Sequence, residues 1–458
     1  MYLDKFLTEY DDSLSSELNI DPLGVLVIWS AFGQAIFKGR VNSISNDVRN
    51  YTLNLFHHYV LKSLVEDDAV LLGSALHKRY SSKADLNFRY ACLIHLENLF
   101  VYSMLAHESS AGADTVGVLG ISKARRRWNE SHHNPLISFG HEGDCQVLVR
   151  QTMLGVSGRY KTPMIEMKFF DREYRYDLPG GEPQWSRVEE LVAKTPSLQS
   201  LYTQLRTYLQ QLIAQSSARE LKFNVEAVSR SLQLAYVEAF STPAFVGSYS
   251  REFWLAVTEL DRGAAGALYR VLQKSLNNPR AEKLSPPELF AKASEDPSLD
   301  AAEKDRIAHI CLLEPLLTEL DLMFTLMLTD KRQPLEQAAE AWSQLGRNKQ
   351  TLPRLAAEIE NQPSMFSVLS DTGRKRLRQL LDVSKEPSIE CQMRALHDYH
   401  CRVMERRGQL PWLRLGDNTL HLDVAARRQP TREQRGWANN YYVPQFKNLL
   451  LGLWGVTA

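Results

Sequence analysis

The feature that most constrains the fold of this chain is the helical spacing of its apolar residues. Between positions 84 and 107, apolar side chains follow one another at intervals of three or four residues, and they are Leu86, Tyr90, Leu93, Leu96, Phe100 and Met104. This spacing places them on one face of an α-helix. Similar patterns are present before position 84 and again from position 185 onward in the 458-residue chain. We therefore predict a mainly α-helical protein.

Two signals for helix N-termini support this prediction. Asp21-Pro22 precedes the apolar run 23–37, and Asn46-Asp47 precedes a second helical pattern. Asp and Asn are favoured N-caps, and proline is favoured at the first helical position. The run 23–37 spans about 15 residues, whereas a membrane span needs about 20. We expect a buried helix there, and no membrane partner.

The stretch 112–183 differs from the rest of the chain because it is rich in glycine and contains three short β-prone runs. These runs are 136–139, 146–154 and 164–170. Such runs between glycines are typical of short strands. We expect a small β element inserted into the helical body.

Near the C-terminus, two further β-prone runs, 411–415 and 419–424, flank Gly416-Asp417-Asn418. A short turn of Gly, Asp and Asn between two such runs is a strong local signal for a β-hairpin. The predicted fold class is therefore α+β but mainly α-helical, with a small inserted β element and a C-terminal β-hairpin.

Breaks in the pattern divide the chain into four expected regions. These are an N-terminal helical region 1–111, a small β-containing basic region 112–183, a helical domain 184–388, and a C-terminal part 389–458 with a helix, the hairpin and an aromatic docking tail. The boundary at 183 follows a cluster of prolines and glycines that begins at Leu178. The stretch 277–300, rich in proline and charge, predicts a linker or an exposed loop.

Charge is balanced over the whole chain, with 54 Lys+Arg and 54 Asp+Glu. A neutral chain is not drawn to nucleic acid or anionic lipid by its overall field. The net charge is −5 over residues 1–120 (9 Lys+Arg against 14 Asp+Glu), +3 over 121–180 (10 against 7), −4 over 181–370 (20 against 24) and +6 over 371–458 (15 against 9). Any binding to a polyanion must therefore come from local surfaces.

The cysteines indicate the compartment. Five of them are present, Cys92, Cys145, Cys311, Cys391 and Cys401, and they lie far apart in the sequence. Few, scattered cysteines in odd number are typical of reduced thiols, so we expect a cytoplasmic protein without a disulfide framework.

The first candidate nucleic-acid surface lies between residues 123 and 161. It consists of Lys123, Arg125, Arg126, Arg127, Trp128, Arg159 and Lys161. Cations beside an aromatic ring can neutralise phosphates and stack on a base. The alternative is that the arginines form a solvated helix face that pairs with the acidic N-terminal region.

A second basic set lies in the last 90 residues and includes Arg427 and Arg428, which we take as candidate nucleic-acid contacts. Its other members are Arg374, Lys375, Arg376, Arg378, Arg402, Arg406, Arg407, Arg432 and Arg435. Aromatic residues interleave with it, and the apolar tail 436–453 follows. Chain ends are frayed unless they dock, so we expect this tail to dock on its own core or on a protein partner.

A possible catalytic constellation is formed by Asp144, Glu166 and Lys168. On a strand, Glu166 and Lys168 would point to the same side, and Asp and Glu can hold Mg²⁺. This spacing resembles the PD-(D/E)xK nuclease core over about 25 residues. The resemblance implies a Mg²⁺-dependent nuclease, and the alternative is an exposed strand face.

Other chemistry has less support. His132, His133, His141 and Cys145 lie close together in the sequence, but without zinc-ligand spacing, so we predict no metal site. Walker, nucleophile-elbow and dinucleotide-binding motifs are absent from the sequence. We assign no catalytic residue and no cofactor outside the nuclease alternative, which alone would use Mg²⁺.

The function that we expect from these patterns is a non-enzymatic subunit of a cytoplasmic multi-protein assembly. It would handle DNA or RNA through its basic surfaces, in a bacterial genome-defence (antiviral) or DNA-processing complex. The alternatives are the nuclease and a pure protein-interaction scaffold. The many helices, the local basic surfaces and the aromatic tail motivate this expectation.

Overall fold

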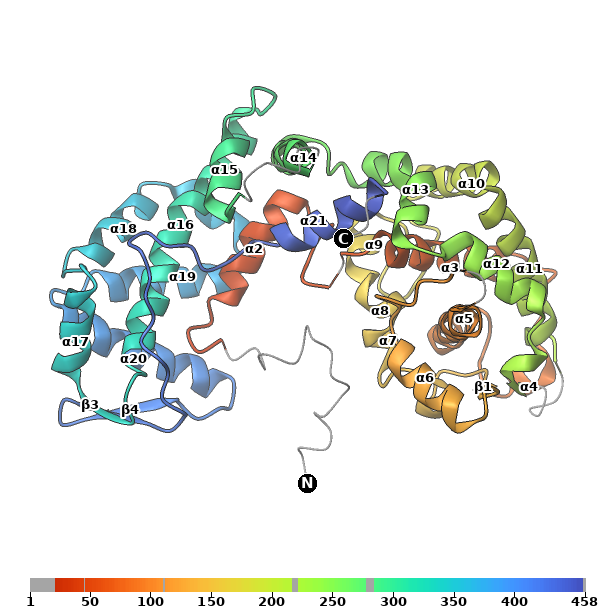
Figure 1. Ribbon diagram of the computed structural model, residues 1–458, viewed down its shortest axis with the longest axis horizontal. Coiled ribbons are helices and arrows are strands. Elements are labelled where there is room, and N and C mark those ends of the chain that lie inside the picture. The colour runs from red at the N-terminus through yellow and green to blue at the C-terminus, as the bar shows by residue number, and fades with distance from the viewer. Residues whose placement is uncertain (1–20, 45, 110–111, 216–220, 277–283, 456–458) are drawn as a thin grey trace. The chain divides into compact units, whose positions relative to one another are not determined.

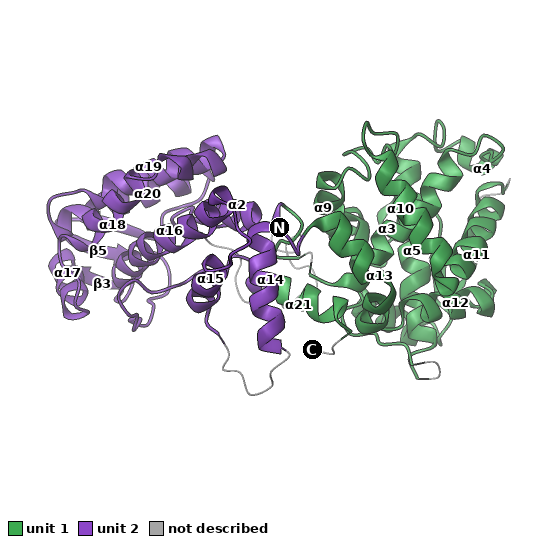
Figure 2. Cartoon of the chain, turned by 90° about the horizontal axis from the view of Figure 1, so that it is seen from above, with its two compact units in different colours: residues 1–9, 39–259, 444–458 green, residues 10–38, 260–443 purple. Residues whose placement is uncertain are grey.

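The computed structural model of the chain describes residues 21–44, 46–109, 112–215, 221–276 and 284–455. Helices dominate, and the strands form two small sheets (Figure 1). The predicted fold class is therefore confirmed. Two compact units are present, coloured separately in Figure 2.

Each unit is assembled from separated parts of the sequence. Unit 1 contains Gly39–Glu259 and the stretch from Pro444 onward, and unit 2 contains Leu260–Val443 and the stretch that ends at Lys38. The proline and glycine cluster 178–183 lies inside unit 1, and position 388 lies inside unit 2. The four expected regions stay a prediction.

Unit 1 is a helical body with one two-stranded sheet. Its elements are α3 (Val48–Val65), α4 (Ser74–His77), α5 (Leu86–Ala106), α6 (Ile121–Glu130), β1 (Leu136–Ser138), η2 (Gly143–Cys145), α7 (Gln151–Leu154), α8 (Val156–Arg159), α9 (Lys161–Glu166), α10 (Glu182–Lys194), α11 (Pro196–Ile213), β2 (Lys222–Asn224), η3 (Val225–Ala227), α12 (Arg230–Phe240) and α13 (Pro243–Thr258). The C-terminal helix α21 (Val443–Leu453) joins it from Pro444 onward.

The helix predicted between 84 and 107 is confirmed as α5, which is buried along nearly its whole length and packs against α3, α6 and α12. The N-cap prediction for α3 is confirmed as well. The Asp47 carboxylate accepts hydrogen bonds from the backbone N–H groups of Arg49 (2.7 Å) and Asn50 (3.4 Å), which satisfies donors that a helix start leaves free.

Of the three strands expected in 112–183, one is confirmed. β1 pairs antiparallel with β2, a strand that the sequence pattern did not indicate. The predictions for 146–154 and 164–170 are wrong, because these residues form short helices and turns. The Gln151 side chain accepts from the N–H groups of Val147 (2.9 Å) and Leu148 (3.2 Å), which replaces the bonds of a strand ladder.

Unit 2 is built around the long helix α16. Its elements are α2 (Leu26–Phe37), α14 (Gly263–Leu276), α15 (Pro286–Ser294), α16 (Ala301–Leu326), β3 (Arg332–Pro334), α17 (Leu335–Gln344), α18 (Thr351–Glu360), η4 (Pro363–Val368), α19 (Asp371–Ser384), α20 (Ile389–Arg406), β4 (Leu413–Gly416) and β5 (Thr419–Leu422). Helices α2, α14, α15, α17, α18 and α20 all pack against α16.

The predicted hairpin is confirmed as β4 and β5, which β3 extends to a sheet of order β3-β5-β4. Asp417 and Asn418 both have positive φ, 48° and 60°, as a tight hairpin turn requires. The loop expected at 277–300 is wrong in part. Residues 286–294 form α15, whose first turn is closed by a capping box of Ser285 and Glu288.

The C-terminal tail docks on its own chain. Tyr441 is buried in unit 2, whereas Phe446 and Leu450 are buried in unit 1. In unit 1 the approach is so close that a Cβ on Gly247 would lie 1.8 Å from the carbonyl oxygen of Gly452. The tail is thus occupied within the chain, and a protein partner at the aromatic residues stays a prediction.

Candidate nucleic-acid interface

The first predicted surface lies on α6, where the structure shows internal partners for two of its main residues. Arg125 donates to both carboxylate oxygens of Glu108, at 2.6 and 2.9 Å. These bonds lower the pKa of Glu108 to about 2. The Trp128 ring stacks with the rings of Tyr102 and His133, with centroid distances of 6.3 and 5.7 Å. This geometry agrees with the alternative of a helix face paired with acidic residues.

The remaining α6 cations differ in exposure. Arg126 is exposed, and Lys123 and Arg127 are half-buried. These three cations are spread over a ten-residue helix, and Glu108 neutralises Arg125, which lies between them in the sequence. They therefore form a weak phosphate-binding surface. We therefore do not place the interface here.

Arg159 and Lys161 hold the local backbone. The Arg159 Nε donates to the carbonyl of Leu154 at 2.9 Å, and the Lys161 ammonium donates to the carbonyl of Arg172 at 2.6 Å. The Lys161 ammonium also lies 4.1 Å from the centroid of the Tyr174 ring, and burial lowers its pKa. Both cations stabilise the fold of this segment.

The constellation that resembles a nuclease core is not carried on strands. Asp144 lies in the short 3-10 helix η2, Glu166 ends helix α9, and Lys168 has a positive φ of 63°. The prediction required Glu166 and Lys168 to lie on one side of a strand, and the described segment has no strand there. The exposed-strand alternative fails for the same reason.

Within the described residues, Glu142, Asp144 and Cys145 form a group of potential metal ligands whose ligand atoms lie within 4.8 Å of one another. Arg79 already binds the Glu142 carboxylate at 2.6 Å. Burial raises the pKa of the Cys145 thiol to about 11, which opposes formation of the thiolate that binds metals. We assign no metal to this cluster.

A different surface, on α19 and α20 of unit 2, gathers cations from two helices. We define the basic face as Arg376 on α19 with Arg402 and Arg406 on α20. Burial raises the pKa of the Tyr399 phenol, and the positive charges of Arg376, Arg402 and Arg406 lower it in part. All three guanidinium groups thus act on the charge of one phenol, although they come from two packed helices.

Two of the three cations of the basic face are accessible. Arg402 and Arg406 are exposed, whereas Arg376 is half-buried and donates to the carbonyl of Gly24. Neither Arg402 nor Arg406 forms a hydrogen bond or an ion pair with any residue of the described ranges. By contrast, Arg125, Arg159 and Lys161 each have a partner. The basic face is thus the surface on which phosphate groups would meet unneutralised positive charge.

Arg376 and three neighbouring side chains hold the beginning of the described chain. The backbone carbonyls of residues 21, 22, 23 and 24 accept hydrogen bonds, in this order, from the side chains of Arg407, His400, Tyr399 and Arg376. His400 and Tyr399 lie on α20, Arg407 follows α20 directly, and Arg376 lies on α19. The last three bonds measure 2.8 Å each. Four consecutive carbonyls bound in this way fix the path of the chain along the two helices.

The two other predicted contacts, Arg427 and Arg428, belong to the same unit and are exposed. The Arg427 guanidinium lies 4.9 Å from the centroid of the Trp412 ring. The backbone N–H of Trp412 donates to Nε2 of His400, at 2.9 Å. Arg427 is therefore linked through Trp412 to α20.

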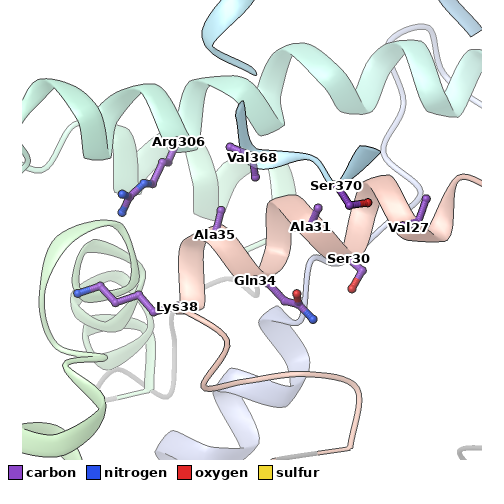
Figure 3. Close-up of a pocket in the computed structure, with 9 residues that line it drawn as sticks. All are labelled: Val27, Ser30, Ala31, Gln34, Ala35, Lys38, Arg306, Val368 and Ser370. Atoms are coloured by element: carbon purple, nitrogen blue, oxygen red, sulfur yellow. The ribbon is translucent and has the colours of Figure 1, made fainter. Parts of the chain in front are cut away.

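A hollow of about 700 Å³ follows α2 in unit 2 (Figure 3). Figure 3 shows the small side chains Val27, Ala31 and Ala35 along one line of the helix, with Lys38 and Arg306 at one end. The residues that line it include no carboxylate, imidazole or thiol. Its lining does contain Ser30, Ser370 and Lys38, whose hydroxyl and amine groups can take part in catalysis, but no carboxylate or imidazole that could activate them is among the lining residues.

No known protein family, curated protein or solved structure matches this chain. Across the described ranges, every helix is too short or too polar to cross a bilayer. The basic face and its geometry are thus the observations from which function is inferred.

Proposed function

We propose that this protein is a non-enzymatic subunit of a cytoplasmic multi-protein assembly and that it contacts nucleic acid through the basic face. One observation carries the proposal. Arg402 and Arg406 are exposed and have no partner in the described ranges, whereas Arg125, Arg159 and Lys161 are bound internally.

The chemistry of these side chains suits phosphate. Arg402 and Arg406 are four residues apart on α20, so they lie on one side of the helix about 6 Å apart along its axis. Guanidinium groups bind phosphate oxygens in a bidentate manner. Such contacts position a nucleic acid without reading its sequence, so we expect binding with little sequence preference and a strong dependence on salt.

The role of a subunit rests on what surrounds the face. The α2 hollow has no carboxylate, imidazole or thiol beside its two serines and its lysine. A protein that binds a polyanion without transforming it acts together with other chains. The setting that we propose is a genome-defence or DNA-processing complex.

The test measures binding of fluorescein-labelled single-stranded DNA, duplex DNA and RNA by fluorescence anisotropy. The variant Arg402→Glu/Arg406→Glu is compared with Arg230→Glu/Arg251→Glu, which changes the charge equally at two exposed arginines of unit 1. We expect the first variant to lose at least about tenfold in affinity at low salt. Its slope of log affinity against log salt should fall by about 1.8 on duplex DNA, because each lost phosphate contact contributes about 0.9.

The control variant should bind within about twofold of the wild type, since exposed single charges far from a site contribute little. Equal affinities of the two variants would place the contact elsewhere. Failure of the wild-type protein to bind any of the three probes at low salt would overturn the proposal and leave the interaction scaffold as the remaining role.

A further inference from the structure

A further hollow, in unit 1, is lined by helices α3 and α10 and by the segment 176–178. The two helices pack against each other (Figure 2), and the hollow has a volume of about 480 Å³. Helix α10 contributes Glu182, Trp185 and Glu189, which are three and four residues apart and therefore lie on one side of the helix. A small ligand fits, because ligand pockets have volumes of about 300–1,000 Å³.

The lining of this hollow is strongly acidic, and we call it the acidic hollow. Its four carboxylates and single ammonium group give a net charge of −3, and they belong to Glu66, Asp177, Glu182, Glu189 and Lys62. The four carboxylate residues are exposed. Lys62 pairs with Glu66, whereas the other three carboxylates have no hydrogen bond and no ion pair within the described ranges. Charges of one sign repel one another and destabilise a fold, so a bound cation would stabilise this region.

The most buried side chains of the lining are aromatic. Tyr176 and Trp185 are 4% and 6% exposed, and their ring centroids lie 5.6 Å apart in an edge-to-face arrangement. The Lys62 ammonium lies 5.9 Å from the centroid of the Trp185 ring, a distance at which an aromatic ring attracts a cation. The chain therefore already holds one ammonium group between a carboxylate and a ring in this hollow.

The carboxylates are spread along the hollow. Glu182 and Glu189 are seven residues apart on α10, so they are separated by about 10 Å along the helix axis. Among the described residues, the carboxylates of the acidic hollow form no group whose ligand atoms lie within 4.8 Å of one another. A metal ion requires such convergence of its ligands. An extended ligand with several separate positive charges does not require it.

We propose that the acidic hollow binds a linear polyamine, a flexible chain of methylene groups that carries several ammonium groups. The ammonium groups pair with Asp177, Glu182 and Glu189, and the methylene groups lie against the aromatic residues. Each of these exposed charge pairs is weak, so affinity depends on the number of charges on the ligand and falls as salt rises. The proposal is independent of the basic face, because that face lies in the other unit.

The experiment is isothermal titration calorimetry of the full chain at low salt, with spermidine as the probe. The variant Glu182→Gln/Glu189→Gln is compared with Glu226→Gln/Glu238→Gln, which removes the same charge at two exposed glutamates of unit 1 outside the hollow. We expect the first variant to bind at least about threefold more weakly than the wild type. The control variant should bind like the wild type, and n-butylamine, with one positive charge, should bind more weakly than spermidine.

The variant Lys62→Met tests the proposal in the opposite direction. It keeps an unbranched side chain but removes the ammonium group that competes for the carboxylates. Spermidine should therefore bind at least about twofold more tightly. A misfolded protein would not gain affinity in this way, and circular dichroism verifies that Glu182→Gln/Glu189→Gln retains its helical content.

Four results would overturn the proposal. They are the absence of spermidine binding to the wild type, equal affinities of the two glutamine variants, a loss of affinity in Lys62→Met, and displacement of spermidine by an equal concentration of Mg²⁺, which would assign the hollow to a metal ion. If a hexalysine peptide binds and spermidine does not, the hollow accepts a basic segment of a protein partner and the polyamine is refuted.

Discussion

The buried ion pair between Arg347 and Glu319 leads to a quantitative prediction for unit 2. Both side chains are 2% exposed, and the guanidinium donates to the two carboxylate oxygens at 3.0 and 2.9 Å. Arg347 also donates to the carbonyls of Arg432 (2.9 Å) and Glu433 (2.8 Å). One side chain therefore joins α16 to the segment that follows the hairpin.

Replacing Arg347 with Met leaves the Glu319 carboxylate buried without its counter-charge. Two opposite charges about 4 Å apart attract by about 4 kcal/mol at an effective dielectric constant of 20. Breaking a buried pair by removing one partner costs about 3–5 kcal/mol. We therefore expect Arg347→Met to lower the free energy of unfolding of unit 2 by this amount. Glu319→Met should cost a similar amount, because it strands the guanidinium.

The double variant Glu319→Met/Arg347→Met should cost less than the sum of the two single variants, because no charge is then left unpaired. The assay is urea denaturation of the full chain, with the transition of unit 2 followed by hydrogen exchange in α16 and α17. The control is Arg354→Met, an exposed arginine on α18 without a side-chain partner in the described ranges, for which we expect a change within about 0.5 kcal/mol. Equal costs for Arg347→Met and Arg354→Met, or additive costs in the double variant, would refute the reasoning.

Three further predictions concern a buried carboxylate, a buried histidine and a close contact of two glycines. Glu314 accepts four hydrogen bonds of 2.6–2.7 Å. Glu314→Ala should therefore lower the free energy of unfolding by about 3–5 kcal/mol and make the segment 435–442 accessible to proteolysis. Glu314→Gln should increase proteolysis less. Burial lowers the pKa of His400 to about 4, and the N–H of Trp412 points at its Nε2. Its stabilising contribution should be complete above pH 6.5 and disappear as pH falls toward 4, because the unfolded chain then binds the extra proton; His400→Gln should remove this part of the pH dependence of thermal unfolding. Gly247→Ala should speed hydrogen exchange in α21, since the new Cβ would meet the Gly452 backbone, whereas Ala244→Gly on the same helix should have a smaller effect.

Local signals predicted the elements that depend on neighbouring residues. The Asp47 cap and the turn at Asp417-Asn418 were predicted because the chemistry of a cap or a tight turn lies within a few residues. The strand expected at 146–154 failed because a glutamine side chain, and no neighbouring strand, binds its backbone. β-propensity alone does not contain that information.

The candidate site shows the same limit. The sequence predicted a cationic α6. The pairing of Arg125 with Glu108 could not be predicted, because a loop separates the two residues in the sequence. The sequence also contains Arg376, Arg402 and Arg406, yet only the packing of α19 against α20 brings the charge of Arg376 to the other two. Charge runs are visible in a sequence, whereas their neutralisation by distant residues is decided by the fold.

The interleaved order of the two units has a consequence for synthesis on the ribosome. Helix α2 is made early, but its packing partners α16 and α19 follow more than 260 residues later, which at about 5–20 residues per second takes roughly 15–50 s. Unit 1 in turn waits for α21, near the end of the chain. Neither unit corresponds to a contiguous fragment, so cutting the gene at position 259 would yield two incomplete products, each with apolar surface suited to capture by chaperones.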